Sequence, residues 1–281
     1  MALPDFIIVG AMKCGTTTLA AQLGAQPGIF MSTPKEPNFF SDDAVYAKGL
    51  DWYEHLFDEA LPGDIKGEAS THYTKLPTYP NCIDRLTAAL KEPKIIYLIR
   101  DPLVRTVSQY MHEWSMGTLT GDYAEIFPDH PELISYSCYG EQIAPYVHAY
   151  GAENILVTSL EDLSIQPRQI LNEVCDFLGY EGQPMWHEEK SKLNISAERI
   201  RRFPLHDILI DNTVATTLRR SLVPRALRNK IKNARRLYDR PAPPPGLKEQ
   251  LRGVFDQDYD VLRSFFPDSD RIDASYRFLT E

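Results

Sequence analysis

The sequence predicts an α/β protein with a central, mostly parallel sheet and helices on both faces. Two apolar runs support this prediction, at residues 6–9 and 94–99, because such uninterrupted runs are typical of strands that are buried on both faces. Each run is followed by residues that begin a helix: a glycine- and threonine-rich loop after the first, and Asp101-Pro102 after the second. We therefore expect strand–loop–helix units with a ligand cleft at the carboxyl ends of the strands.

The loop after the first strand has the composition of a phosphate-binding loop. Gly10 and Gly15 permit tight turns, and Lys13 lies before the second glycine, whereas a Walker loop places its lysine directly after that glycine. The next helix opens with three threonines, Thr16, Thr17 and Thr18. Its free backbone amides are suited to an anion. The loop is thus predicted to bind an anion other than a Walker triphosphate, the alternative being an ordinary turn with a surface lysine.

The second apolar run ends at another candidate anion site. Asp101 is a good N-cap and Pro102 suits the first helical position, so a helix is expected to begin there. Arg100 then stands at the carboxyl end of the strand, and Ser108 lies two turns into the helix. An arginine and a hydroxyl so placed can hold a second phosphate. The alternative is that Arg100 pairs with a nearby carboxylate and Ser108 is solvated.

Composition is consistent with one catalytic domain over residues 1–281. The 281 residues are 43% apolar and 25% charged, without an internal repeat or low-complexity block. Residues 219–281 are expected to form a basic helical segment followed, after the stiff connection Pro241–Gly246, by a closing helix. The net charge of −9 argues against a nucleic-acid-binding protein.

The sequence also gives expectations about location, cysteines and metals. The first strand begins within about five residues of the start, without a signal peptide, and no apolar run approaches the ~20 residues of a membrane span, so a cytoplasmic location without a transmembrane segment is expected. The four cysteines show no metal spacing and are predicted to be free thiols: Cys14, Cys82, Cys138 and Cys175. For Cys14, a small residue tolerated in the turn is favoured over a reactive thiol activated by the helix N-terminus. No metal site is implied, and the oligomeric state is left open.

Five short motifs, taken together in this order, resemble the sulfotransferases that use 3′-phosphoadenosine 5′-phosphosulfate. They occupy residues 4–17, 35–40, 48–53, 67–70 and 98–102. Among those enzymes the resemblance is to the heparan sulfate and related carbohydrate sulfotransferases. It implies sulfuryl transfer to a hydroxyl or amine of a carbohydrate or small metabolite, with adenosine 3′,5′-bisphosphate as the product and without a metal.

The resemblance assigns residues to the donor. It places the 5′-phosphosulfate on the first loop, with residues Lys13, Cys14, Gly15, Thr16, Thr17 and Thr18. In this assignment Lys13 neutralises the leaving oxygen, and Arg100 and Ser108 hold the 3′-phosphate. Residues 192–202 resemble a loop that closes over the nucleotide, with Arg201 as the candidate contact among three arginines there.

The resemblance also assigns Glu36 as the general base that takes the proton of the acceptor. The chain departs from many relatives on this side, because Ala69 stands where they have lysine, and Asn38 and Ser41 stand where they have histidine and aspartate. Three further residues are candidates for acceptor binding or for sharing the base role, and each histidine has a structural role as its alternative: Glu68, His72 and His112. Several aromatic side chains are candidates either for acceptor stacking or for the core: Phe39, Phe40, Trp52, Tyr53 and Trp114.

Two alternative functions stay open. A phosphate-loop nucleotide or sugar kinase shares the strand–loop–helix opening and predicts binding of ATP with Mg²⁺, although the register of Lys13 argues against it. The second alternative is a non-catalytic relative that binds the nucleotide, because Ala69 replaces a lysine of many relatives. Lys13 and Glu36 together favour an enzyme.

Overall fold

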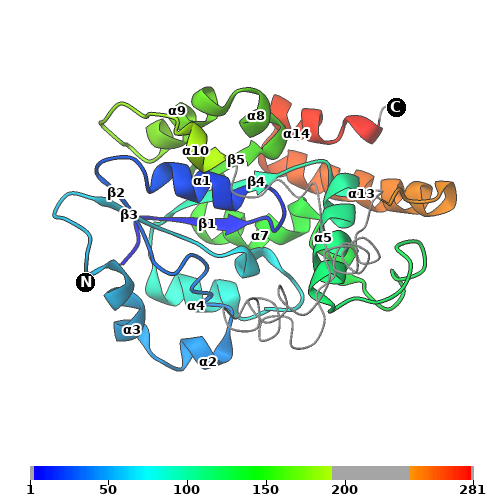
Figure 1. Cartoon of the computed structure of the whole chain (residues 1–281), viewed down its shortest axis with the longest axis horizontal. Helices are drawn as coiled ribbons and strands as arrows, with labels where there is room; N and C mark the ends of the chain where they lie inside the picture. Colours follow the sequence, from blue (N-terminus) through cyan, green and yellow to red (C-terminus); the bar gives the residue numbers. More distant parts are fainter. Residues whose placement is uncertain (1–2, 192–240, 280–281) are drawn as a thin grey trace, which may run out of the picture.

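The computed structural model of the protein describes residues 3–191 and 241–279. In these ranges five parallel strands form one sheet in the order β2-β3-β1-β4-β5 (Figure 1). The strands are β1 (Phe6–Gly10), β2 (Ile29–Met31), β3 (Ile65–Ala69), β4 (Lys94–Ile99) and β5 (Ile155–Ser159). The predicted α/β class and parallel sheet are confirmed.

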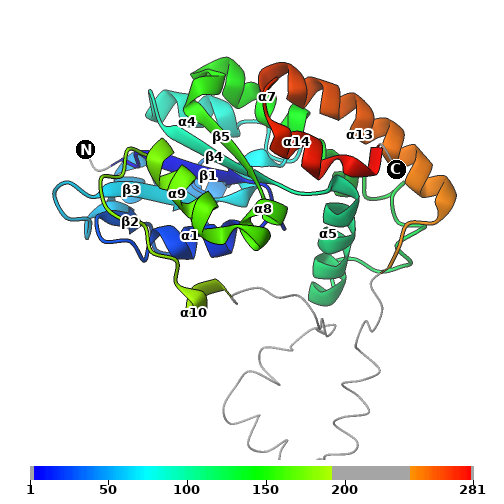
Figure 2. The ribbon, with the colours of Figure 1, turned by 90° about the horizontal axis from the view of Figure 1, so that it is seen from above.

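Helices cover both faces of the sheet (Figures 1 and 2). One face carries α1 (Thr16–Leu23), α8 (Leu160–Ile165) and α9 (Pro167–Phe177). The other carries α4 (Cys82–Ala89) and α7 (Tyr139–Tyr150), and α13 (Pro245–Phe265) packs along α7. The remaining helices are α2 (Asp43–Tyr46), α3 (Leu50–Glu54), α5 (Pro102–Met116), α6 (Glu132–Ser135), α10 (Glu188–Ser191) and α14 (Asp270–Ser275). Short 3₁₀ helices lie at His55–Phe57, Thr71–Thr74, Ala152–Asn154 and Arg277–Leu279.

The two apolar runs form the neighbouring central strands β1 and β4, as predicted. All the side chains of β1 are buried, and so are those of β4 after its first residue. Because every strand is parallel, the carboxyl ends of β1, β3 and β4 meet at one edge of the sheet, and the segments that follow them lie close together.

Helix α5 begins as the sequence predicts, with Pro102 in its first turn and the Asp101 carboxylate accepting the Val104 amide proton at 3.0 Å. The closing helix α13 begins at Pro245, so the last two residues of the expected extended connection are helical. Proline lacks the amide hydrogen that the first turn leaves unpaired, which explains this earlier start.

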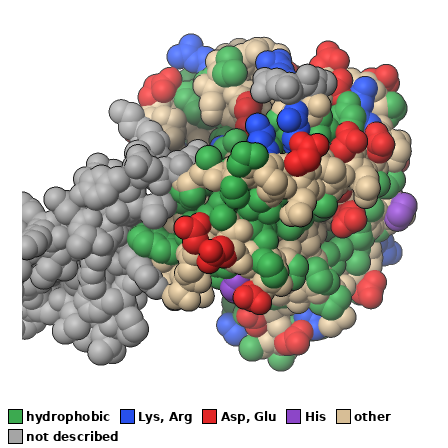
Figure 3. Space-filling view, turned by 90° about the vertical axis from the view of Figure 1, so that its right-hand side faces the viewer, with side chains coloured by type: hydrophobic (Ala, Val, Ile, Leu, Met, Phe, Trp, Pro, Cys, Tyr) green, Lys and Arg blue, Asp and Glu red, His purple; other side chains and the backbone are tan. Residues whose placement is uncertain are grey.

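The predicted basic segment at residues 219–240 lies outside the described residues, as does Arg201. The single-domain prediction therefore stays untested. All four cysteines are described, and each is a buried free thiol, as predicted. Among the described helices, none combines the length and the apolar character that a membrane crossing requires. On the face shown in Figure 3, acidic side chains are scattered among hydrophobic ones.

Asp258 fastens the closing helix to the rest of the protein. Its carboxylate accepts the amide protons of Gly140 and Glu141 at 3.0 and 2.9 Å and the hydroxyl proton of Tyr276 at 3.1 Å. Burial raises the pKa of Asp258 to about 6, although these three donors favour the carboxylate. A Cβ at Gly140 would stand 2.7 Å from the Asp258 carbonyl oxygen, so only glycine permits this approach of α7 to α13.

We expect Asp258→Ala to lower the free energy of unfolding by about 2–4 kcal/mol, because two amides and a hydroxyl lose a buried acceptor. Urea denaturation measures the loss. The exposed Asp256→Ala on the same helix is the matched control, with an expected change within about 0.5 kcal/mol. An equal loss in the two variants would show that the attachment does not depend on this carboxylate.

Candidate functional site

A cavity of about 740 Å³ opens at the carboxyl edge of the sheet. It brings together ten of the predicted site residues: Lys13, Gly15, Thr16, Thr17, Thr18, Glu36, His72, Arg100, Ser108 and His112. Cys14 and Glu68 do not line it. Four segments that are distant in the sequence, one after each of β1, β2, β3 and β4, therefore contribute to one site, and the binding roles of these residues stay predictions. In the ranges that the structure describes, no group of three or more His, Cys, Asp or Glu side chains is arranged to hold a metal ion.

The loop between β1 and α1 has an unusual backbone. Lys13 has a φ of 73° and Gly15 a φ of 91°, in the left-handed region that non-glycine residues rarely adopt. The left-handed backbone at Gly15 favours glycine, and a Cβ there would stand 2.8 Å from the Leu160 side chain, which would have to shift. The amide of Thr18 donates back to the Gly15 carbonyl at 3.0 Å, while the helix start leaves earlier amides directed outward. This end of α1 is suited to an anion.

Cys14 faces away from the cavity. Its Sγ lies 3.6 Å from the Tyr139 hydroxyl, and its amide donates to the Ala11 carbonyl at 3.1 Å. Burial raises the pKa of the Cys14 thiol to about 11, although Arg105 and Arg100 lower it. An activated thiol would have a lowered pKa, whereas that of Cys14 is raised. The interpretation of Cys14 as a small residue inside the turn is therefore the better one.

Arg100 joins the carboxyl end of β4 to the loop. One guanidinium nitrogen, Nη1, donates to the Lys13 carbonyl at 3.2 Å, and the Arg100 amide donates to the Tyr139 hydroxyl at 3.4 Å. Its Nε is buried without a hydrogen-bond partner among the described residues. Ser108, which is 8% exposed, lines the same cavity. Arg100 and Ser108 thus form a second group of hydrogen-bond donors, separate from the loop amides, in which the Arg100 Nε–H still has no acceptor in the part of the chain that the structure describes.

Glu36 lies in the loop after β2 with a φ of 60°. Its carboxylate pairs with Lys35 Nζ at 2.6 Å and accepts the Thr71 hydroxyl proton at 3.1 Å. Burial alone raises the pKa of Glu36, but Lys35 and these hydrogen bonds outweigh it and lower the pKa below 4.5. Glu36 is thus ionised at neutral pH. Lys13, Glu36 and Asn38 are the non-glycine residues with positive φ in the described ranges, so this strain is confined to the two loops of the site.

Glu68 does not line the cavity. It is fully buried on β3 and accepts hydroxyl protons from Tyr53 at 2.7 Å and Tyr73 at 3.1 Å. Burial raises the pKa of Glu68 to about 7, against the effect of these hydrogen bonds. Its position does not favour direct contact with an acceptor.

His72 and Lys75 line the cavity close to Glu36. Burial and the neighbouring Lys75 lower the pKa of His72 to about 4, so its ring is neutral at neutral pH. That ring stacks on Tyr79 at 4.6 Å, and its buried Nδ1 has no hydrogen-bond partner among the described residues. Burial also lowers the pKa of Lys75 to about 8, although Glu36 raises it.

Sequence reasoning missed several residues in the wall of the cavity. They are Met12, Thr71, Lys75, Leu160, Leu163, Ser164, Pro167, Trp186, Glu188 and Ser191. Thr71 and Lys75 follow the motif at residues 67–70, which was a usable signal, whereas Trp186 comes from an irregular segment without periodicity. The aromatic candidates Phe39, Phe40 and Tyr53 pack against one another in the core, and neither Trp52 nor Trp114 lines the cavity.

Comparison with known proteins gives the same family as the motifs. The family profile described as sulfotransferase domain matches residues 3–206, well over half of the chain. The chain is 31% identical over 186 residues to mouse heparan sulfate glucosamine 3-O-sulfotransferase 3B1, a match that covers 63% of this chain and 46% of that protein. It is 38% identical over 113 residues to the membrane-associated sulfotransferase kil1 of Dictyostelium discoideum, covering 39% of this chain and 23% of that protein. The matches thus span less than half the length of these curated relatives.

Solved structures show the same fold. A sulfotransferase from Alicyclobacillus acidocaldarius superposes with a TM-score of 0.67 and 23% identity, covering 99% of this chain and 100% of that one. Mouse sulfotransferase SULT7A1, solved as a complex with PAP, gives a TM-score of 0.50 and 15% identity, covering 98% of this chain and 89% of that one. The match to the mouse heparan sulfate enzyme, and not these structures, confirms the sequence resemblance to the heparan sulfate branch.

Stability is expected to depend on the protonation of Glu68. The folded protein binds this proton more tightly than the unfolded chain, because the pKa rises from 4.5 to about 7 on folding. By linkage, the free energy of unfolding falls as the pH rises through this window, by up to about 3 kcal/mol. Glu68→Gln should remove this contribution, so that its stability relative to wild type increases between pH 4.5 and 8. Urea denaturation across this range tests it, with the exposed Glu59→Gln as control; parallel curves for Glu68→Gln and wild type would contradict it.

Proposed function

The chain belongs to the sulfotransferase family, and we propose that it transfers a sulfuryl group from 3′-phosphoadenosine 5′-phosphosulfate to a hydroxyl or amine of a carbohydrate or small metabolite. One observation supports the proposal: two separate groups of candidate anion-binding residues line the same cavity. The first is the loop with Lys13 and the threonines of α1, and the second is Arg100 with Ser108. A donor with a phosphosulfate at one end of its ribose and a phosphate at the 3′ position needs two such sites.

The residues present fit this donor. The buried Nε of Arg100 lacks a partner among the described residues, so a phosphate oxygen would satisfy a group that is otherwise unpaired. The narrow turn at Gly15 lets backbone amides approach an anion closely. When bound, the donor supplies a sulfuryl group: the acceptor oxygen or nitrogen forms a bond to sulfur while the bond from sulfur to the bridging phosphate oxygen breaks.

The side chains of the protein would act at the two ends of this reaction. Lys13 stabilises the negative charge that develops on the leaving phosphate oxygen. Glu36, which is ionised, takes the proton of the attacking hydroxyl or amine. No covalent intermediate with the protein is needed, because alignment and charge stabilisation supply the catalysis, as they do in phosphoryl transfer. His72 and His112 also line the cavity, and in this proposal they would bind the acceptor.

The first test of this proposal is calorimetric titration with adenosine 3′,5′-bisphosphate and, separately, with ATP and Mg²⁺. Wild type should bind the bisphosphate with micromolar or tighter affinity, and Arg100→Ala should weaken binding at least about tenfold, because a charge-assisted pair with the phosphate is lost. Arg168→Ala, an exposed arginine outside the cavity, is the matched control. Preference for ATP with Mg²⁺, or binding of neither nucleotide, would overturn the proposal.

The role of Glu36 has its own test. Glu36→Gln keeps the shape of the side chain but cannot take a proton, so we expect turnover to fall by about 10²-fold or more while bisphosphate affinity changes little. The measurement is transfer of labelled sulfate from the donor to a panel of carbohydrates and small hydroxyl or amine compounds. Glu92→Gln, at an exposed position, controls for the loss of one carboxylate. Normal turnover of Glu36→Gln, under conditions where chemistry limits the rate, would remove Glu36 from the base role.

A further inference from the structure

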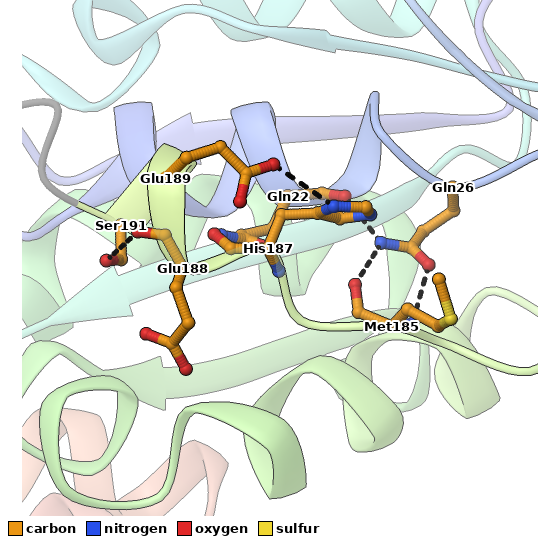
Figure 4. A network of polar contacts seen from close by, with 7 residues as sticks. All are labelled: Gln22, Gln26, Met185, His187, Glu188, Glu189 and Ser191. Carbon is orange, nitrogen blue, oxygen red and sulfur yellow. Dashed lines mark hydrogen bonds and ion pairs between the residues drawn. The ribbon is translucent and has the colours of Figure 1, made fainter.

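Two glutamines hold an irregular segment of the cavity wall by its backbone (Figure 4). Gln22 accepts the amide proton of His187 at 2.9 Å and donates to the His187 carbonyl at 2.7 Å. Gln26 does the same with Met185, at 2.8 and 2.9 Å. The side chain of Gln26 also donates to the Gln22 carbonyl at 2.8 Å, which ties the two glutamines together. Both are buried, with exposures of 0% and 3%.

This arrangement copies the bonding of a β-ladder. In a ladder, alternate residues of a strand direct both N–H and C=O to the same neighbour, and Met185 and His187 do so here. In a ladder this neighbour is another strand. Here the side-chain amides of Gln22 and Gln26 take its place. Trp186 lies between the two clamped residues, and it lines the cavity. The clamp thus fixes the backbone on both sides of Trp186.

The same helix serves two parts of the cavity. The first turn of α1 contributes Thr16, Thr17 and Thr18 to the cavity, while Gln22 lies at the other end of α1 and Gln26 just beyond it. The wall of the cavity also includes the apolar residues Leu160, Leu163 and Pro167. A planar base needs apolar and aromatic surface, whereas phosphates need the loop amides and cations. The clamp therefore connects the anion-binding end of the site to its apolar wall through one helix.

We propose that Gln22 and Gln26 are positioning residues for the sulfuryl donor, which hold Trp186 and the adjoining wall against the base-bearing part of the nucleotide. This inference rests on the proposed function, because it takes the bound nucleotide to be the phosphorylated adenosine. The glutamines themselves act through the clamped backbone and do not line the cavity. If the two glutamines had a purely structural role, their loss would lower the stability of the protein. It would then weaken binding of the base and of the phosphates alike.

The test uses two ligands that differ only in the base. Gln22→Met combined with Gln26→Met keeps similar side-chain volume and removes all the clamp hydrogen bonds. We expect its Kd for adenosine 3′,5′-bisphosphate to rise at least tenfold, with less than a twofold change for ribose 3,5-bisphosphate, which has both phosphates and no base. Wild type that binds neither ligand would overturn the proposed function itself. If wild type binds and the double variant has an unchanged Kd, the proposed role of the clamp is wrong. The same holds if the Kd rises equally for both ligands; in either case the proposed function stands.

A matched control comes from a similar clamp elsewhere in the protein. Gln142 on α7 accepts the Leu76 amide proton at 2.7 Å and donates to the Leu76 carbonyl at 3.0 Å, and it is 1% exposed. Gln142→Met should lower the melting temperature but leave the affinity for adenosine 3′,5′-bisphosphate within twofold of wild type. A tenfold loss of affinity in this variant would show that general loosening explains the result, and would contradict the clamp.

A conservative variant supplies a rescue experiment. In Gln22→Glu a carboxylate cannot donate to the His187 carbonyl, whereas a protonated carboxyl group can both donate and accept, as the amide does. The affinity of Gln22→Glu for the bisphosphate, relative to wild type at the same pH, should therefore recover at least fivefold between pH 8 and pH 5. Gln22→Met should not recover. The neighbouring titratable groups, His187 and Glu189, are present in all three proteins, so Gln22→Met controls for any effect of pH that does not depend on residue 22. No recovery in Gln22→Glu would count against the clamp.

Discussion

The buried guanidinium of Arg105 is the interaction on which the anion loop depends. This side chain is 0% exposed and donates to the Met12 carbonyl at 3.2 Å, to Ser137 Oγ at 2.6 Å and to the Leu133 carbonyl at 3.3 Å. Among the described residues it forms no ion pair with a carboxylate. Neutral acceptors satisfy its hydrogen bonds without cancelling its charge, so a positive charge persists directly beneath the loop. One side chain thus joins the loop, α5 and the segment before α7.

Arg100 and Arg105 together determine which backbone groups the loop presents. They hold the consecutive carbonyls of Lys13 and Met12, so neither carbonyl is left as a bare acceptor toward an anion. The strained φ of Lys13 is compensated by this pair of hydrogen bonds. Electrostatic stabilisation is most effective when the donors are already in place before charge develops on the substrate. A loop that is fixed in this way meets that condition. Removal of either guanidinium would therefore disturb the geometry of the loop as well as its charge.

Local signals explain why part of this structure could be predicted from the sequence. Strands β1 and β4 and the start of α5 follow from short apolar runs and a capping pair, and the motifs at their ends identified Lys13, Arg100 and Ser108 as residues of one site. Trp186 could not be found this way, because its position depends on a contact between Gln22 and His187, which are 165 residues apart. The burial of Glu68 depends on the tyrosines that pack over β3, which a motif does not reveal.

The charges on the acceptor side favour a late proton transfer under the proposed mechanism. Lys35 keeps the pKa of Glu36 low, and burial with Lys75 keeps that of His72 near 4, so both candidate bases are weak before an acceptor is attacked. A weak base takes a proton only after the acceptor has become acidic, which happens as its bond to sulfur forms. Under the same mechanism Lys75, which lines the cavity, would stabilise negative charge on the acceptor side. Under this mechanism the acceptor side stabilises negative charge that appears during the transfer. Lys75 supplies a cation there, which Ala69 does not.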